Sequence, residues 1–119
     1  MNTEAKVYPT TPDTDGFYLE SLQDEFMNVH TKKYDNGSVV KKVLLRNGRI
    51  AIVREMERTE MKRVHSLAGD TSTDNDRYTA ALIAVCTKID DQEIIMEDVL
   101  EYKAKDFSRL TYASQTLNF

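Results

Sequence analysis

The chain has very little of what common catalytic motifs require. Its 119 residues include one cysteine, four glycines and no tryptophan. A single cysteine excludes an internal disulfide and favours a reducing compartment. The sequence has no glycine-rich phosphate-binding loop, no G-x-S-x-G nucleophile elbow, no H-E-x-x-H zinc motif and no C-x-x-C pair. We therefore expect a protein that is not an enzyme, with no catalytic residue, no bound metal and no cofactor.

Long hydrophobic runs are also missing. No stretch reaches the roughly 18 apolar residues of a membrane span, and no basic segment followed by an apolar one opens the chain. We therefore expect neither membrane insertion nor secretion. The content of 40% hydrophobic and 30% charged residues is typical of a globular protein with a modest core.

The acidic segment 90–101 contains an incomplete calcium-loop pattern. Asp90 and Glu101 have the spacing of the first and twelfth positions of such a loop. However, Ile94 and Ile95 occupy the fifth and sixth positions, where the loop needs an oxygen ligand and a glycine. The segment is therefore interpreted as a turn followed by an apolar link.

The most apolar stretch of the chain spans residues 78–89. Tyr78, Leu82 and Val85 recur at helical spacing, and small or apolar residues fill the other side. At about 12 residues, this helix is too short to cross a bilayer, which needs roughly 20. The pattern predicts a buried central helix, in which Cys86 is a core residue with the raised pKa of a buried thiol.

Two β-rich runs, 39–45 and 50–56, flank Asn47-Gly48. This dipeptide favours a two-residue type I′ turn, because both central positions of that turn have positive φ. The turn predicts the following opposed pairs: Leu45 with Ile50, Val43 with Ile52, Val39 with Met56, Arg46 with Arg49, and Lys41 with Arg54. Leu44 and Val53 would then lie on the face away from the helices, and the like-charge pairs require acidic groups nearby.

Residues 1–37 are interpreted as a flexible N-terminal arm, because both prolines and several turn formers lie there. A helix is expected at 17–29, with Tyr18, Leu22, Phe26 and Val29 on one face. That face either packs on the core or docks on a partner. The polar segment 31–37 would link the arm to the rest of the chain.

The second half of the chain predicts further helices. Thr59 would cap a helix over 60–68, which ends at Gly69, and residues 70–75 would form a polar loop. Short helices are expected over 97–102 and from Asp106 onward. The terminal Leu117 and Phe119 either dock on the core or remain free for a partner.

Together these elements predict an α+β fold, in which an antiparallel β-hairpin packs on three or four α-helices within residues 38–119. The residues that we consider candidates for partner binding are Tyr18, Leu22, Phe26, Val29, Leu44, Val53, Leu117 and Phe119.

Charge is distributed unevenly along the chain. The net charge is -4, yet residues 41–63 contain eight basic and three acidic side chains. This basic strip can contact phosphates, the chain's own acids or an acidic partner. No aromatic residue is interleaved among the bases, so stacking on single-stranded nucleic acid is unsupported.

The order of several short motifs resembles that of the bacteriophage tail assembly chaperones. The matching segments, spread over about residues 38–112, are Val43–Arg49, Ile52–Met56, Thr59–Met61, Tyr78–Ala84, Thr87–Asp90, Glu97–Leu100 and Asp106–Leu110. Asp91 stands where members of that family often carry glycine, and residues 1–37 lie outside the resemblance.

The resemblance implies a non-enzymatic protein of the infected host's cytoplasm that is absent from the mature virion. It implies that the protein binds the phage tape measure protein and keeps it soluble until the tail tube assembles around it, with the tail tube protein as a second partner. Self-association into a homo-oligomer is expected as well. Two alternatives are a small phage-encoded inhibitor of a host factor and, less favoured, a nucleic-acid-binding protein that uses the basic hairpin.

Overall fold

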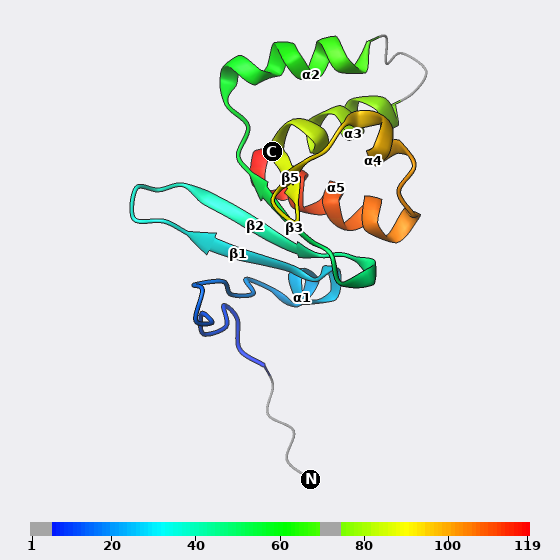
Figure 1. The fold of residues 1–119 in the computed structure, drawn as a ribbon. Coiled ribbons are helices and arrows are strands. Elements are labelled where there is room, and N and C mark those ends of the chain that lie inside the picture. The colour runs from blue at the N-terminus through cyan, green and yellow to red at the C-terminus, as the bar shows by residue number, and fades with distance from the viewer. Residues whose placement is uncertain (1–5, 70–74) are drawn as a thin grey trace.

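The computed structural model describes residues 6–69 and 75–119, which form an α+β fold (Figure 1). The helices are α1 (Leu22–Met27), α2 (Met61–Ala68), α3 (Asn75–Cys86), α4 (Met96–Leu100) and α5 (Ala104–Asn118). The strands are β1 (Val29–Lys33), β2 (Val39–Leu44), β3 (Ile50–Arg54), β4 (Thr87–Ile89) and β5 (Gln92–Glu93). Short 3₁₀ turns span Arg46–Gly48 and Arg58–Glu60. The predicted fold class is therefore confirmed.

The sheet is wider than the predicted hairpin. Its order is β1-β2-β3-β4-β5, and every neighbouring pair is antiparallel. Strand β1 pairs with β2 over its full length, from Val29 opposite Val43 to Lys33 opposite Val39. Residues 29–33 thus belong to the sheet, and the expectation that they form part of a flexible arm and linker was wrong.

The register of the β2–β3 hairpin differs from the predicted one by one residue. Leu44 lies opposite Ile50 and Val43 opposite Ala51, because the loop has three residues. The amide of Leu45 donates to the carbonyl of Arg49 at 2.9 Å, which closes the loop over Arg46–Gly48. Asn47 and Gly48 do adopt positive φ, at 63° and 74°, but a third loop residue precedes them.

Because side chains alternate between the two faces of a strand, this shift exchanges the inward-facing and outward-facing residues of β3. Ala51 and Val53 are fully buried, while Ile50 is 41% exposed and Ile52 is half-buried. Val53 was expected on the outer face and is instead a core residue. Lys41 lies opposite Val53, so the expected pairing of Lys41 with Arg54 is absent from the hairpin.

Helix α3 is the centre of the core, as predicted. Leu82 and Ile83 are buried, and the helix contacts α2, α4, α5, β3 and β4. It ends at Cys86 rather than at Ile89, because the β-branched Thr87 and Ile89 pair with β3. Helix α5 packs on β2 and β3, so α3 and α5 together cover the inner face of the sheet (Figure 1).

The predicted helix at 17–29 is much shorter in the structure. Ser21 caps α1, and Asn28, at φ 55°, ends it. Before the helix, Tyr18 forms a bridge with Thr31, and after it Val29 enters β1, where it is fully buried. Tyr18 and Val29 therefore do not share a helical face with Leu22 and Phe26. Residues 1–5 of the predicted arm and 70–74 of the predicted polar loop lie outside the described residues.

Two further helices begin differently from the prediction. A 3₁₀ turn precedes α2, and Glu57 with Glu60 forms its capping box, so Thr59 is not the cap. Helix α5 begins at Ala104 rather than at Asp106, which therefore lies in its first turn.

Asp106 joins α5 to the β2–β3 loop. Its carboxylate is 3% exposed and accepts from the backbone amide of Arg46 at 3.0 Å and from the Arg49 guanidinium at 3.5 Å. One turn further, Arg109 donates to the carbonyl of Leu44 at 2.9 Å. The acid that the basic loop was expected to need therefore comes from within the chain.

We expect Asp106→Ala to lower the free energy of unfolding by roughly 2–3 kcal/mol, because it removes the buried carboxylate that accepts from both the Arg46 amide and the Arg49 guanidinium. Asp106→Asn keeps an acceptor for Arg46 but removes the charge facing Arg49, so its loss should be smaller. Urea unfolding measures both values. Asp98→Ala, which removes an exposed first-turn acid of α4, is the control and should change stability by about 0.5 kcal/mol or less. Equal losses for Asp98→Ala and Asp106→Ala would contradict this role of Asp106.

Candidate partner-binding surface

Helix α1 is held to the rest of the protein through its polar side chains. The hydroxyl of Ser21 accepts from the amide of Asp24 at 3.1 Å. The buried carboxylate of Asp24 accepts from the Tyr112 hydroxyl at 2.5 Å, and burial together with this hydrogen bond raises the pKa of Tyr112 to about 12. Glu25 accepts from Lys6 and, at 3.1 Å, from the Tyr8 hydroxyl. This six-residue helix is therefore fixed in place even though it is short.

Two of the three large apolar side chains of α1 face solvent, whereas Met27 is half-buried and packs against the core. Leu22 is 67% exposed and Phe26 is 77% exposed. Beside Phe26 lies a hollow of about 410 Å³, which α1 and the start of α5 form together. Its lining residues are Phe26, Met27, Ala104, Lys105, Ser108 and Arg109. We call Leu22 together with these lining residues the α1 patch; it has the apolar centre and polar rim of a protein-binding surface.

The other predicted binding residues lie apart from the α1 patch. Val29 and Val53 are fully buried, so they stabilise the core. Tyr18 and Leu44 are half-buried in the sheet region. Leu117 packs against the core, while Phe119 is 76% exposed beside Gln115 and Thr116. Of the eight candidates, only Leu22 and Phe26 share one exposed surface of the described residues. Lys105 and Arg109 were missed because nothing in the sequence places the start of α5 beside α1.

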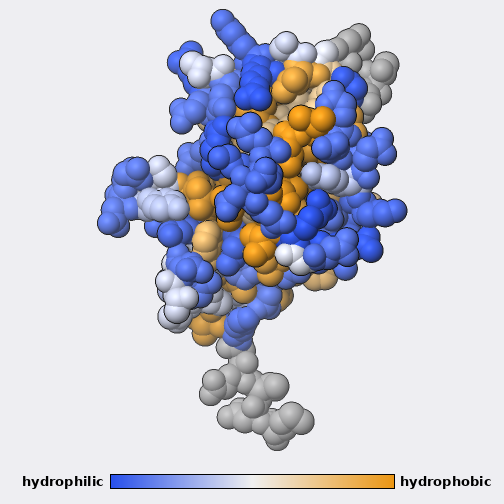
Figure 2. All heavy atoms as spheres, in the orientation of Figure 1, coloured by the Kyte–Doolittle hydropathy of each residue, from blue (hydrophilic) through white to orange (hydrophobic). Residues whose placement is uncertain are grey.

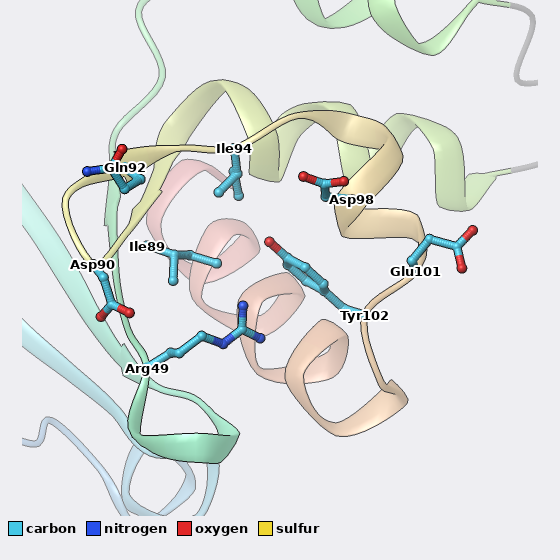
Figure 3. Close-up of a pocket in the computed structure, with 8 residues that line it drawn as sticks. All are labelled: Arg49, Ile89, Asp90, Gln92, Ile94, Asp98, Glu101 and Tyr102. Atoms are coloured by element: carbon cyan, nitrogen blue, oxygen red, sulfur yellow. The ribbon is translucent and has the colours of Figure 1, made fainter.

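A second hollow, of about 490 Å³, lies between the β2–β3 loop and α4 (Figure 3). Arg49 extends across it toward Tyr102, with the guanidinium 5.3 Å from the ring centroid, and burial raises the pKa of Tyr102. Asp90 accepts from the amide of Ile50 at 3.0 Å. Since Arg49 also contacts Asp106, the central polar groups of this hollow already hold the fold together.

The cysteine and the histidine that could form a nucleophile pair are Cys86 and His65. Burial raises the pKa of Cys86 to about 11, so its thiol is protonated at neutral pH. The ring of His65 packs against that of Tyr78, with 5.4 Å between the centroids. Within residues 6–69 and 75–119, no three His, Cys, Asp or Glu side chains form a group that could hold a metal ion.

Half of the basic strip is paired inside the chain. Both Arg54 Nη atoms lie 2.7 Å from Glu60 carboxylate oxygens, and Arg54 also donates to the carbonyl of Val85 at 3.0 Å. Lys42 lies 3.8 Å from Asp13, and Lys41 lies 4.0 Å from Glu20. With Arg49 held by Asp106, four of the eight basic residues lie within 4.0 Å of an acidic side chain, which reduces the charge available to phosphates.

Comparisons with protein-family models, curated proteins and solved structures find no match to this chain. In the part of the chain that the structure describes, no helix has the length and apolar character needed to cross a membrane.

The Arg54–Glu60 pair predicts a pH dependence of stability. Arg54 lowers the pKa of Glu60 from 4.5 to about 2 in the folded chain. A depressed folded-state pKa stabilises the protein above the unfolded value, and this contribution is lost as pH falls from about 4.5 toward 2. We therefore expect the stability difference between the wild type and Glu60→Gln, measured by urea unfolding, to be largest above about pH 5 and to shrink toward about pH 2. Glu101→Gln is the control for removing one negative charge, and a Glu60→Gln difference that stays constant from about pH 6 to about pH 2 would contradict the prediction.

Proposed function

We propose that this protein is a non-enzymatic tail assembly chaperone of a bacteriophage. It binds the tape measure protein in the cytoplasm of the infected host, keeps it soluble while the tail tube forms, and does not enter the mature virion. Support comes from the ordered resemblance over residues 38–112 and from an exposed apolar surface on a helix that polar contacts hold in place.

The observation that carries the proposal is the exposure of Leu22 and Phe26 on an anchored helix. Two large apolar side chains that are 67% and 77% exposed gain free energy when a partner covers them. The ordering of the helix has already been achieved by its own contacts, so binding loses little conformational entropy. A preformed surface of this kind suits reversible contact with apolar segments of a long client.

The rim of the α1 patch suggests which client segments bind best. Lys105 is exposed beside the hollow, and Arg109 lines it with no acidic residue among the lining side chains. An amphipathic helix that presents an aromatic or aliphatic side chain, with an acidic residue one turn away, matches this arrangement.

The test is co-expression with the tape measure protein of the same phage, followed by size-exclusion chromatography with light scattering. The wild type should elute with a soluble client that is insoluble when expressed alone. The double variant Leu22→Asp, Phe26→Asp should retain at least about tenfold less client, because two buried contacts are replaced by charges that must be desolvated.

Ile95→Asp is the matched control, because Ile95 is also a large exposed side chain, at 58%, but lies outside the α1 patch. It should retain the client like the wild type. Circular dichroism confirms that each variant is folded. A client that stays insoluble with the wild type contradicts the chaperone function. Equal client retention by the wild type and the double variant contradicts the assignment of the α1 patch.

A further inference from the structure

A third hollow, of about 380 Å³, lies against the sheet between β2 and β5, away from the α1 patch; we call it the sheet groove. Figure 2 shows hydrophobic residues running down the middle of one face, among hydrophilic ones. The apolar residues that line the sheet groove are Val40, Ile52, Ala84, Val85, Cys86 and Ile94. Val40, Ile52, Ala84 and Ile94 are half-buried, so a partner could remove them further from water.

The acidic residues of the sheet groove and Arg63 lie on different elements. Asp91, in the β4–β5 turn, and Glu93, on the edge strand β5, supply the negative charge. Arg63 supplies positive charge from α2. All three side chains are exposed, and within the described residues none of them has a hydrogen-bond or ion-pair partner.

The two remaining charges of the sheet groove are Arg54 and Lys88. Arg54 is held by Glu60 and the carbonyl of Val85. Lys88 is exposed directly opposite Glu93 on the neighbouring strand and offsets one of the two negative charges there. A partner thus meets Arg63 on the α2 side, and on the β5 side it meets Asp91, Glu93 and Lys88, whose net charge is negative.

We propose that the sheet groove binds a second copy of this chain in a two-fold symmetric dimer. A two-fold axis through the apolar floor brings the α2 side of one copy against the β5 side of the other. Arg63 of each copy then faces Asp91 and Glu93 of the other, and the half-buried floor residues cover one another. The separation of opposite charges across one apolar hollow makes the surface complementary to itself.

Other occupants fit this charge pattern less well. A uniformly acidic or uniformly basic segment would meet repulsion at one side of the groove, and like charges in contact are costly. A second copy satisfies both sides simultaneously and requires no other molecule.

The test uses two charge reversals, Arg63→Glu and Glu93→Arg, and sedimentation velocity from micromolar concentrations to about 1 mM. The wild type should dimerise, and each single variant should raise the Kd by roughly tenfold or more, because it places like charges in both symmetric contacts. An equimolar mixture of the two variants should restore the dimer. In that heterodimer, the two reversed side chains face each other as an opposite-charge pair, and the second symmetric contact keeps the native Arg63 and Glu93.

Lys62→Glu, an exposed reversal on α2 outside the sheet groove, is the control and should dimerise like the wild type. A monomeric wild type, single variants that dimerise normally, or a mixture that stays monomeric would each overturn the proposal. The proposal is independent of the chaperone function: the double variant Leu22→Asp, Phe26→Asp should still dimerise, and the charge-reversed monomers should still bind a client through the α1 patch.

Discussion

The buried carboxylate of Asp106 is the contact on which the arrangement of the sheet and helices depends. It belongs to the first turn of α5, yet it accepts from the amide of Arg46 and from the Arg49 side chain in the β2–β3 loop. Arg109 repeats the connection one turn later through the carbonyl of Leu44. These contacts join segments that are far apart in the sequence, and they place α5 across β2 and β3. The same contacts bring the start of α5 beside α1, where the hollow of the α1 patch forms.

The chain uses polar contacts to hold elements that expose apolar side chains. Helix α1 is held in place by hydrogen bonds of Ser21, Asp24 and Glu25, and Leu22 and Phe26 are left facing solvent. The reverse arrangement, with Leu22 and Phe26 in the core and the acids in water, is the ordinary one for a short amphipathic helix. The hydrogen bond between the buried Asp24 carboxylate and Tyr112 holds the helix in this orientation. This inversion supports the binding role that we propose.

The parts of the fold that were predictable from sequence are those in which the pattern is local. The apolar run containing Leu82 predicted the central helix, and α3 does lie in the core. The end of that helix was not predictable from periodicity, since Thr87 and Ile89 fit either structure until β3 is available for pairing. Asn47-Gly48 correctly marked a turn, but two positive φ angles do not distinguish a two-residue loop from a three-residue loop. The one extra loop residue moves the inward-facing side chains of β3 from the predicted set to the alternate one. Asp91, at φ 65° in the β4–β5 turn, adopts a left-handed conformation that glycine reaches more easily.

The candidate surface was predictable only in part, for the same reason. Helical spacing correctly grouped Leu22 with Phe26. It also grouped Tyr18, which forms a bridge with Thr31, and Val29, which lies in β1 opposite Val43. The most direct measurement on the central claim is hydrogen–deuterium exchange of the protein with and without the tape measure protein that we propose as its client. We expect slower exchange in residues 22–28 and 104–109 of the complex, with the β1–β2 turn unchanged. Slower exchange elsewhere, with α1 unaffected, would contradict the α1 patch as the client-binding surface.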